Sequence, residues 1–387
     1  MTGDSIYLDY AASTPLAPEV LEAMVAASGP GGVFANPSSV HAEGRRSARA
    51  VAEARSQLGR LMGADPDCLN FTSGATESDN LAIRGAAHAR ANRGRHLVTM
   101  PTEHKAVTDT FHSLEKEGFE VTWINPGADG LLHPGDLVGA LRDDTQLVSV
   151  MHVNNEIGVI QDIAAIGRVC REREILFHTD AAQSTGKLPI DLSTLPVDLL
   201  SLTGHKFYGP KGIGALYVAD RPGCNLMPIL YGGGQEKRLR PGTLPVPLIV
   251  GLGVAAEVAR QQADDDYRHI SVLSRRFLNG LSEVADLTFN SSAQQGYPGI
   301  INVSAGGVEG ESLMLAMEPL CVASGSACNS TNAAPSYVLR ALGRTDVDAQ
   351  GAVRFSFGRT TTEAEVDRAL GIFKAAVGKI RQIADGA

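Results

Sequence analysis

The sequence predicts an α/β protein with a large domain, built on a mostly parallel sheet, and a small α+β domain at its C-terminal end. Between residues 68 and 218, apolar strand-like segments alternate with helical ones, which is typical of a sheet covered on both faces. The chain has 387 residues, more than one core usually supports, and this alternation stops after a polar stretch at 261–266. We therefore predict a large domain over 16–263 and a small domain formed by 1–15 and 264–387.

The N-terminal segments indicate a short strand and two helices. Residues 6–15 read as a strand that enters a loop, and a helix begins at Pro18, where proline suits the first turn. Residues 29–39 lack periodicity and predict a long loop. Over 40–62 the apolar residues recur at helical spacing, which predicts an amphipathic helix.

A glycine turn follows the next strand, at 68–72, and opens a helix that runs to residue 91. Free backbone N–H groups near Ala75 and Thr76 would point outward there, and the Thr76 hydroxyl could donate to a phosphate oxygen. The turn therefore predicts an anion site. An ordinary capping box is the alternative.

Strand-like segments then recur at 96–100, 121–124, 147–151, 175–179 and 199–202, with helices at 104–117 and 162–173. In a parallel sheet, ligands bind beyond the carboxyl ends of the strands. Candidate polar residues follow several of these strands: His104, Asn155, Asp180, Gln183 and Lys206.

Lys206 lies between an apolar strand and a glycine-rich turn, after which 214–218 resumes a strand. We expect this hairpin to hold the lysine rigidly, so that it could bond covalently to an aldehyde. Thr203 and His205 stand beside it as phosphate donors. A solvated lysine in a hairpin is the alternative.

The C-terminal part predicts helices at 244–263 and 269–284 and strands at 287–290, 301–304 and 353–357. A last helix spans 362–383, with Thr362 and Glu365 in capping-box spacing.

Composition narrows the function classes. A net charge of −9 argues against direct nucleic-acid binding, and no apolar run is long enough to span a membrane. The N-terminus has no signal-peptide pattern, so we expect a cytoplasmic protein. The five cysteines lack CxxC spacing, which indicates reduced thiols rather than a disulfide framework or a metal site; they are Cys68, Cys170, Cys224, Cys321 and Cys328.

Together the candidate residues meet the needs of pyridoxal 5'-phosphate (PLP). This cofactor requires a lysine, a carboxylate at its ring nitrogen, a group that stacks on the ring, and a phosphate cup. Lys206, Asp180 and His104 would supply the first three. The cup would be formed by Ala75, Thr76, Thr203 and His205.

The chain resembles the class I cysteine desulfurases of the class V aminotransferase superfamily along essentially its whole length. The motifs that carry the resemblance are Tyr7-Leu-Asp-Tyr-Ala-Ala12, Phe71-Thr-Ser-Gly-Ala-Thr-Glu-Ser-Asp-Asn80, Glu103-His104, Asn154-Asn-Glu-Ile-Gly158, His178-Thr-Asp-Ala-Ala-Gln183, Gly204-His-Lys206, Ser324-Gly-Ser-Ala-Cys328 and Arg354-Phe-Ser-Phe-Gly358.

The resemblance implies a type I PLP fold and a homodimer in which the partner completes each site. It implies that Lys206 bonds to the cofactor and moves protons, that Asp180 pairs with the ring nitrogen, and that Gln183 pairs with the ring hydroxyl. His104 would stack on the ring and transfer protons. Thr243 would contact the neighbouring subunit's phosphate group, and the substrate carboxylate would be held by Asn155 and Arg354.

The resemblance also implies a catalytic cysteine, Cys328, besides the residues that bind the cofactor and substrate. Small residues flank it from 323 to 330, which predicts a flexible loop rather than a core thiol. Its thiolate would take sulfur from L-cysteine, leaving L-alanine and a persulfide. An acceptor protein would then receive the sulfur for iron–sulfur assembly, tRNA thiolation or DNA phosphorothioation. The alternatives are a selenocysteine lyase and a partner-activated sulfur-delivery subunit.

The chain departs from the family pattern in three places, of which one, Thr203 in place of the usual serine, keeps the hydroxyl group. Arg238 and Pro241 replace the usual residues of a loop expected to reach across the dimer, and we expect them to reshape it. The sequence ends at Ala387 without the longer tail with which housekeeping members dock the iron–sulfur scaffold. We therefore expect a specialised acceptor.

Overall fold

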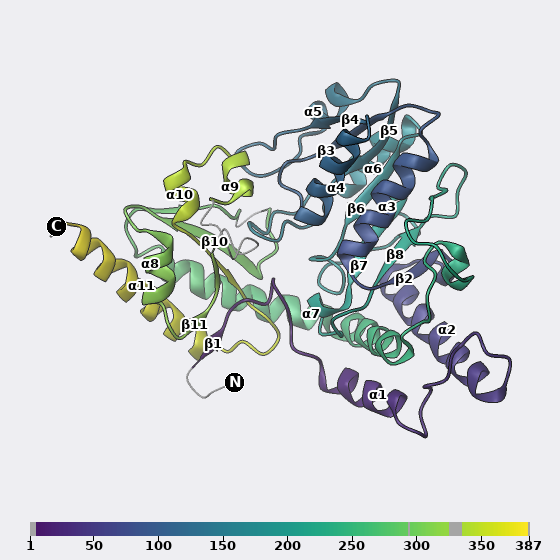
Figure 1. Cartoon of the computed structure of the whole chain (residues 1–387). Coiled ribbons are helices and arrows are strands. Elements are labelled where there is room, and N and C mark those ends of the chain that lie inside the picture. Colours follow the sequence, from purple (N-terminus) through teal and green to yellow (C-terminus); the bar gives the residue numbers. More distant parts are fainter. Residues whose placement is uncertain (1–4, 293–294, 325–334, 386–387) are drawn as a thin grey trace.

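The computed structural model describes residues 5–292, 295–324 and 335–385. Figure 1 shows a sheet flanked by helices, with a second, smaller group of strands and helices beside it. The helices are α1 (Pro18–Ser28), α2 (Ala42–Met62), α3 (Ala75–Ala89), α4 (Lys105–Lys116), α5 (Pro134–Ala140), α6 (Ile163–Glu172), α7 (Val246–Leu281), α8 (Gly310–Ala316), α9 (Tyr337–Ala341), α10 (Asp346–Gln350) and α11 (Glu363–Asp385).

The central sheet has seven strands in the described part of the chain, in the order β2-β8-β7-β6-β5-β3-β4. Strands β3 to β7 run parallel, whereas β8 is antiparallel to both of its neighbours. The predicted mostly parallel sheet is confirmed. Its strands are β2 (Leu69–Thr72), β3 (His96–Thr99), β4 (Glu120–Trp123), β5 (Thr145–Ser149), β6 (Leu176–Asp180), β7 (Leu199–Thr203) and β8 (Gly214–Val218).

Separate hydrophobic clusters cover the two faces of this sheet. On one face, α3 and α4 bury Leu81, Ile83 and Phe111 against the strands. On the other, α2, α5, α6 and α7 form the larger core, with Leu58 and Leu252 among its buried residues. The sheet is therefore enclosed, and its polar strand ends are left as the place for a ligand.

The second sheet joins the C-terminal strands to each other. Its described order is β12-β13-β10-β9, all antiparallel, and α7, α8 and α11 pack around it with Phe277, Phe355 and Phe373 at their contact. The strands are β9 (Leu287–Phe289), β10 (Ile300–Ala305), β12 (Ala323–Ser324) and β13 (Ala352–Ser356). This confirms the predicted α+β character of the C-terminal part.

The predicted break between two helices at 264–268 is wrong, because α7 continues without interruption from Val246 to Leu281. The polar stretch at 261–266 is the exposed middle of this helix. Its first half packs in the core of the large sheet and its second half, from Ile270, packs in the core of the small one. The domain boundary near residue 263 stays a prediction, and it would fall inside a helix.

The N-terminal segment lies against the C-terminal elements. Strand β1 (Ile6–Tyr7) pairs in parallel with β11 (Leu320–Cys321), and Ser356 at the end of β13 donates its N–H to the Leu8 carbonyl oxygen. Residues 9–14 then lead directly to the Lys206 hairpin, since the Thr14 N–H donates to the His205 carbonyl. None of the helices in the described ranges is long and apolar enough to cross a membrane.

Candidate functional site

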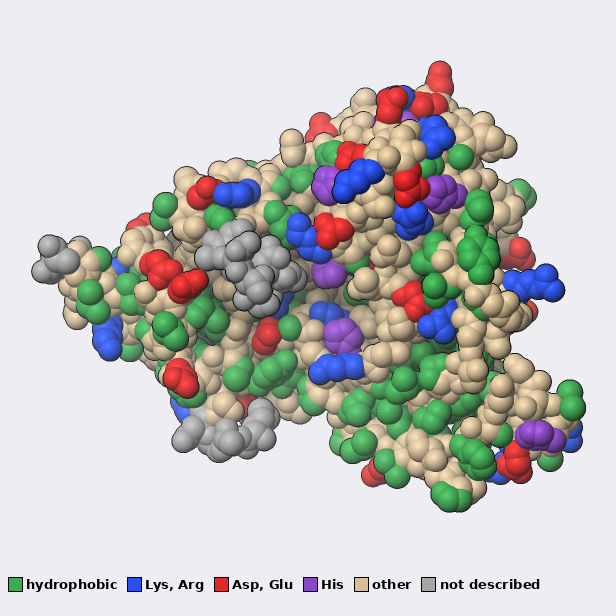
Figure 2. Space-filling view, viewed as in Figure 1, with side chains coloured by type: hydrophobic (Ala, Val, Ile, Leu, Met, Phe, Trp, Pro, Cys, Tyr) green, Lys and Arg blue, Asp and Glu red, His purple; other side chains and the backbone are tan. Residues whose placement is uncertain are grey.

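A cavity of about 510 Å³ lies beyond the carboxyl ends of the large-sheet strands, and Arg354 of β13 also lines it. In Figure 2, basic and histidine side chains gather in a hollow near the middle of the face shown. The predicted residues that line the cavity are Ala75, Thr76, His104, Asn155, Asp180, Gln183, Thr203, His205, Lys206 and Arg354.

The glycine turn before α3 has the geometry of an anion site. Gly74 caps the helix with a φ of 148°, a region that favours glycine, so the first N–H groups of α3 face the cavity wall. Glu77 in the first turn accepts a hydrogen bond from the Ser73 N–H at 2.8 Å and pairs with Arg240 at 2.7 Å. Although burial raises it, the hydrogen bonds from Arg240 and Ser73 hold the pKa of Glu77 below its usual value. The carboxylate thus neutralises Arg240 at the rim of the turn.

His104 is the N-cap of α4. Its Nδ1 accepts the Ala106 N–H at 3.1 Å, so the proton of the neutral ring is on Nε2. Burial lowers the pKa of His104, partly offset by the charge of Asp180. A neutral imidazole with one free N–H therefore faces the cavity.

Asp180 ends β6 on the floor of the cavity. It is 5% exposed, and its Oδ1 accepts the Ala182 N–H at 2.8 Å. Burial raises the pKa of Asp180, while His104 and Lys206 act in the opposite direction. Such a carboxylate is stabilised by a cationic N–H group placed directly against it.

The Ala11 carbonyl oxygen connects two of the predicted residues. It accepts hydrogen bonds from Gln183 Nε2, at 2.7 Å, and from Lys206 Nζ. Lys206 is in the turn between β7 and β8, which pair as the predicted hairpin. Sequence reasoning missed Lys187, whose Nζ donates to Gln183 Oε1 at 2.9 Å; its spacing of four residues from Gln183 was the available signal.

Arg354 and Asn155 both line the cavity and contact each other. Arg354 Nη1 donates to the Asn155 carbonyl at 2.7 Å, and Nη2 pairs with Asp9 Oδ1 at 2.7 Å. Two buried atoms of this pair, Arg354 Nε and Asn155 Oδ1, have no hydrogen-bond partner in the described part of the chain. Asp9 was missed as a site residue, although its motif Tyr7-Leu-Asp-Tyr-Ala-Ala12 was recognised.

Thr203 and His205 line the cavity near Lys206, as predicted. The Thr203 hydroxyl makes only a long 3.5 Å contact with the Ile213 carbonyl, so it is available to another acceptor. Burial, together with the charges of Lys206, Lys211 and Lys187, lowers the pKa of His205 to about 4. His205 is therefore a neutral donor at physiological pH.

Of the predicted residues in the described ranges, Thr243 is the one that does not line this cavity, and it is exposed. Cys328 lies outside the described residues. Among the described cysteines, Cys170 and Cys224 are buried, and burial raises the pKa of their thiols to about 12 and about 11. Cys321 is exposed.

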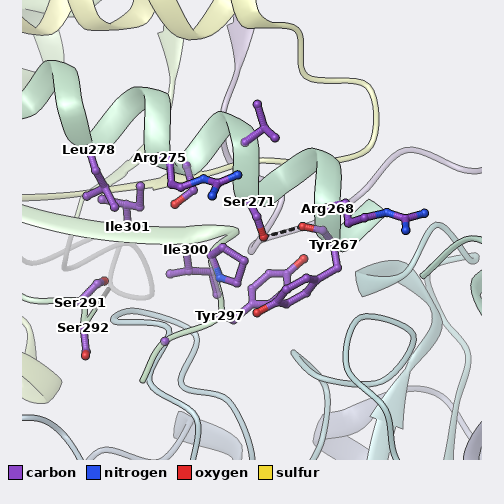
Figure 3. Close-up of a pocket in the computed structure, with 14 residues that line it drawn as sticks. Tyr267, Arg268, Ser271, Arg275, Leu278, Ser291, Ser292, Tyr297, Ile300 and Ile301 are labelled. Atoms are coloured by element: carbon purple, nitrogen blue, oxygen red, sulfur yellow. Dashed lines mark hydrogen bonds between the residues drawn. The ribbon is translucent and has the colours of Figure 1, made fainter. Parts of the chain in front are cut away.

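A second cavity, of about 530 Å³, contains none of the predicted residues. It lies between the second half of α7 and the segment before β10, where Arg268 and Arg275 project from the helix and the Ser271 hydroxyl donates to the Tyr267 carbonyl (Figure 3). Because no lysine, carboxylate or imidazole is among the described residues that line it, it is not the candidate active site.

The residues of the first cavity fit PLP. They provide a lysine on a rigid turn, a buried carboxylate in need of a cationic N–H partner, a neutral imidazole and a helix N-terminus for phosphate. The orphaned Arg354 Nε and Asn155 Oδ1 add polar groups suited to an amino-acid substrate.

Comparisons with known proteins agree with this chemistry. The class-V aminotransferase family model matches residues 6–369. The cysteine desulfurase IscS of Klebsiella pneumoniae subsp. pneumoniae is 52% identical over 379 residues, covering 98% of this chain and 94% of that protein. A solved NifS-like protein superposes with a TM-score of 0.89 at 33% identity, covering 99% of this chain and all of the other. The structure of SspA in complex with cysteine superposes with a TM-score of 0.82 at 41% identity, covering 92% of this chain and 99% of that chain.

Proposed function

The chain belongs to the class-V aminotransferase family and is a PLP-dependent cysteine desulfurase, and from this premise we propose a role for each residue of the cavity. The observation that carries the assignment of roles is the convergence of Lys206, Asp180 and His104 on one cavity that Arg354 also lines. When bound, PLP supplies an electron-accepting ring that weakens bonds of the attached amino acid.

On the cofactor side, Lys206 Nζ holds the cofactor and moves a proton to and from the substrate. The Asp180 carboxylate keeps the ring nitrogen protonated, and Gln183 donates to the ring hydroxyl. The neutral His104 ring covers the cofactor and uses Nε2 for proton transfer, in agreement with its capping Nδ1. Ala75, Thr76, Thr203 and His205 receive the phosphate group.

On the substrate side, Arg354 and Asn155 bind the carboxylate of L-cysteine. Support comes from the buried and unpartnered Arg354 Nε and Asn155 Oδ1. Asp9 accepts from Nη2 and the Asn155 carbonyl accepts from Nη1, so the guanidinium is held in place and Nε is left as a donor for the substrate.

Cys328 is proposed as the sulfur carrier. The Cys328 thiol would release its proton and, as the thiolate, attack the sulfur of L-cysteine. The Cβ–S bond would break with its electron pair left on Cβ, that proton would end on Cβ to give alanine, and the sulfur would remain on Cys328 as a persulfide. The pKa values of Cys170 and Cys224 speak against those thiols as nucleophiles. We place the reaction in the cytoplasm, where thiols stay reduced, and propose that an acceptor protein collects the sulfur.

The test is a single incubation of the purified holoenzyme with L-cysteine and no reductant. We expect one sulfur adduct on the peptide that contains Cys328, matched by an equal amount of alanine. Cys328→Ser should bind cofactor and substrate yet form no adduct. Full sulfide release by that variant would overturn the role of Cys328.

We also propose a homodimer. Apolar side chains are exposed along α1 and the loop after it, including Leu21, Val25, Phe34 and Val40, and Figure 2 shows apolar side chains gathered around this part of the surface. Tyr231, 80% exposed, lies in the same chain segment as Thr243. A second copy of the chain would cover such a surface and bring Thr243 to its neighbour's phosphate group.

Subunit mixing tests the shared site. Lys206→Ala removes the lysine of its own cavity, whereas Thr243→Ala would damage the cavity of the partner. A mixed dimer of the two variants then contains one intact site, so mixing should restore up to about a quarter of the wild-type rate if exchange is statistical and both single variants are inactive. No recovery, with exchange verified by mass, would contradict a site shared in this way.

A further inference from the structure

Lys187 turns its charged end into the protein. The residue as a whole is partly exposed, yet its Nζ donates to Gln183, which is 3% exposed, and lies 5.6 Å from the ring centre of Tyr297, which is 5% exposed. Tyr297 packs beside Tyr267 at the base of the second cavity (Figure 3). Lysines normally keep their ammonium in water and bury only the stem. An ammonium group that points inward, as in Lys187, therefore needs a structural explanation.

An ion pair does not supply that explanation. Lys187, Tyr297 and Asp266 line a third, small cavity, but the Asp266 carboxylate pairs with Arg359 at 2.7 Å. The other charges that act on Lys187 are cations, Lys206 and Arg354; with burial as the largest cause, they lower the pKa of Lys187 to about 7. The remaining titratable groups that line this small cavity are the tyrosines Tyr10, Tyr208, Tyr267 and Tyr297. Lys187 therefore stays inward despite an unfavourable electrostatic environment.

The hydrogen bonds of Gln183 indicate what Lys187 does. An amide can be turned either way, with its oxygen and nitrogen exchanged. The Ala11 carbonyl can only accept, so it requires Nε2, and Lys187 Nζ donates to Oε1, so both neighbours favour the same orientation of the amide. With both satisfied, the remaining hydrogen of Nε2 is the group that Gln183 can offer to the cofactor cavity.

We propose that Lys187 is a positioning residue that locks the Gln183 amide with its N–H, rather than its oxygen, toward the ring hydroxyl of PLP. The inference rests on the proposed contact between Gln183 and that hydroxyl. An N–H donor at this place stabilises the ring oxygen as an anion. By orienting that donor, Lys187 would favour binding of a cofactor that carries the ring hydroxyl and would favour the deprotonated form of the hydroxyl. Through the Ala11 carbonyl, the same network reaches Lys206.

The experiment measures binding to the apoprotein by equilibrium dialysis, with PLP and with 3-deoxypyridoxal 5'-phosphate, which lacks the ring hydroxyl. Wild type should prefer PLP by about tenfold or more, the usual value of a charge-assisted hydrogen bond. In Lys187→Met the preference should fall to about threefold or less. Lys116→Met, at the exposed end of α4, is the matched control and should keep the full preference.

Two further variants separate positioning from folding. Lys187→Arg keeps a donor and should retain part of the preference, and Gln183→Ala should abolish it whether or not Lys187 is also replaced. An unchanged preference in Lys187→Met, or additive losses in the double variant, would overturn the proposal. If wild-type apoprotein shows no preference for PLP over the deoxy compound, the Gln183 contact fails; if it binds neither, the PLP assignment itself fails.

Discussion

The two sides of the cavity are built from the chain in different ways. The cofactor side uses strand ends of one sheet: Asp180 and Lys206 follow the adjacent strands β6 and β7, and His104 follows β3, which β5 separates from β6. The substrate side assembles three distant segments, in which Arg354 reaches Asp9, 345 residues away, and Asn155, 199 residues away. Cofactor binding and substrate binding should therefore respond to different perturbations.

The largest effect is expected from a substitution that damages only the cofactor side. Lys206→Ala removes the covalent anchor and the proton carrier, so alanine formation should fall about 10³-fold or more. The absorbance of the lysine-bound cofactor should disappear while the melting temperature of the apoprotein changes little. Turnover within tenfold of wild type would contradict the role of this lysine.

The next largest effect is expected from a substitution that damages only the substrate side. Arg354→Lys cannot keep Asp9, Asn155 and a carboxylate at once, because an ammonium lacks the planar fork. We expect kcat/KM for L-cysteine to fall about a hundredfold, within the range for disturbing a buried charged pair. The affinity of the apoprotein for PLP should stay within about threefold, since the cofactor groups belong to another part of the chain. Equal losses in both quantities would contradict the separation of the two sides.

A third effect concerns stability and sharpens the difference between the two sides. Glu156, next to Asn155, accepts a hydrogen bond from Ser336 and is 8% exposed. Burial raises its pKa to about 7, although Ser336 and Arg354 act to lower it. The folded state thus binds this proton more tightly than the unfolded state, so the carboxyl lowers stability as pH rises from its unfolded pKa to about 7.

Replacing this carboxyl should show the same pH dependence. Glu156→Gln should stabilise the protein above pH 7 by up to about 3 kcal/mol and much less near pH 5. Urea unfolding at the two pH values measures the difference. A stability change of the same size at both would show that the ionisation of Glu156 is not the cause.

The same contrast explains what the sequence could predict. The cofactor residues follow regular strands, and strand ends in a parallel sheet meet at one edge, so local patterns were enough to bring them together. Asp9 and Lys187 were missed because their roles depend on contacts between segments or on an inward-turned side chain, neither of which leaves a periodic signal.

The wrong helix break has a related cause. The polar stretch Gln261-Gln-Ala-Asp-Asp-Asp266 looks like a linker, yet helix α7 passes from one core to the other and exposes its middle between them. Polar residues in an exposed helical turn and in a loop are alike in composition. Only the presence of a core at each end distinguishes them.

The smallest expected effect concerns the loop that carries Thr243. Glu236, Lys237 and Arg238 have φ values of 45°, 55° and 66°, a left-handed run that favours glycine. Arg238 holds its backbone at a φ that glycine, which has no Cβ, adopts without a clash. Arg238→Gly should therefore stabilise the protein by about 1 kcal/mol.

Glu236 provides the matched control for this prediction. Its φ is equally left-handed, but its buried carboxylate pairs with Arg55 at 2.7 Å and accepts the Phe71 N–H at 2.6 Å. Glu236→Gly should relieve the same backbone strain and still destabilise the protein, by about 2 kcal/mol, because it leaves those donors without their acceptor. Opposite signs for the two substitutions in thermal unfolding would establish that backbone strain dominates at 238 and side-chain bonding at 236; equal signs would refute it.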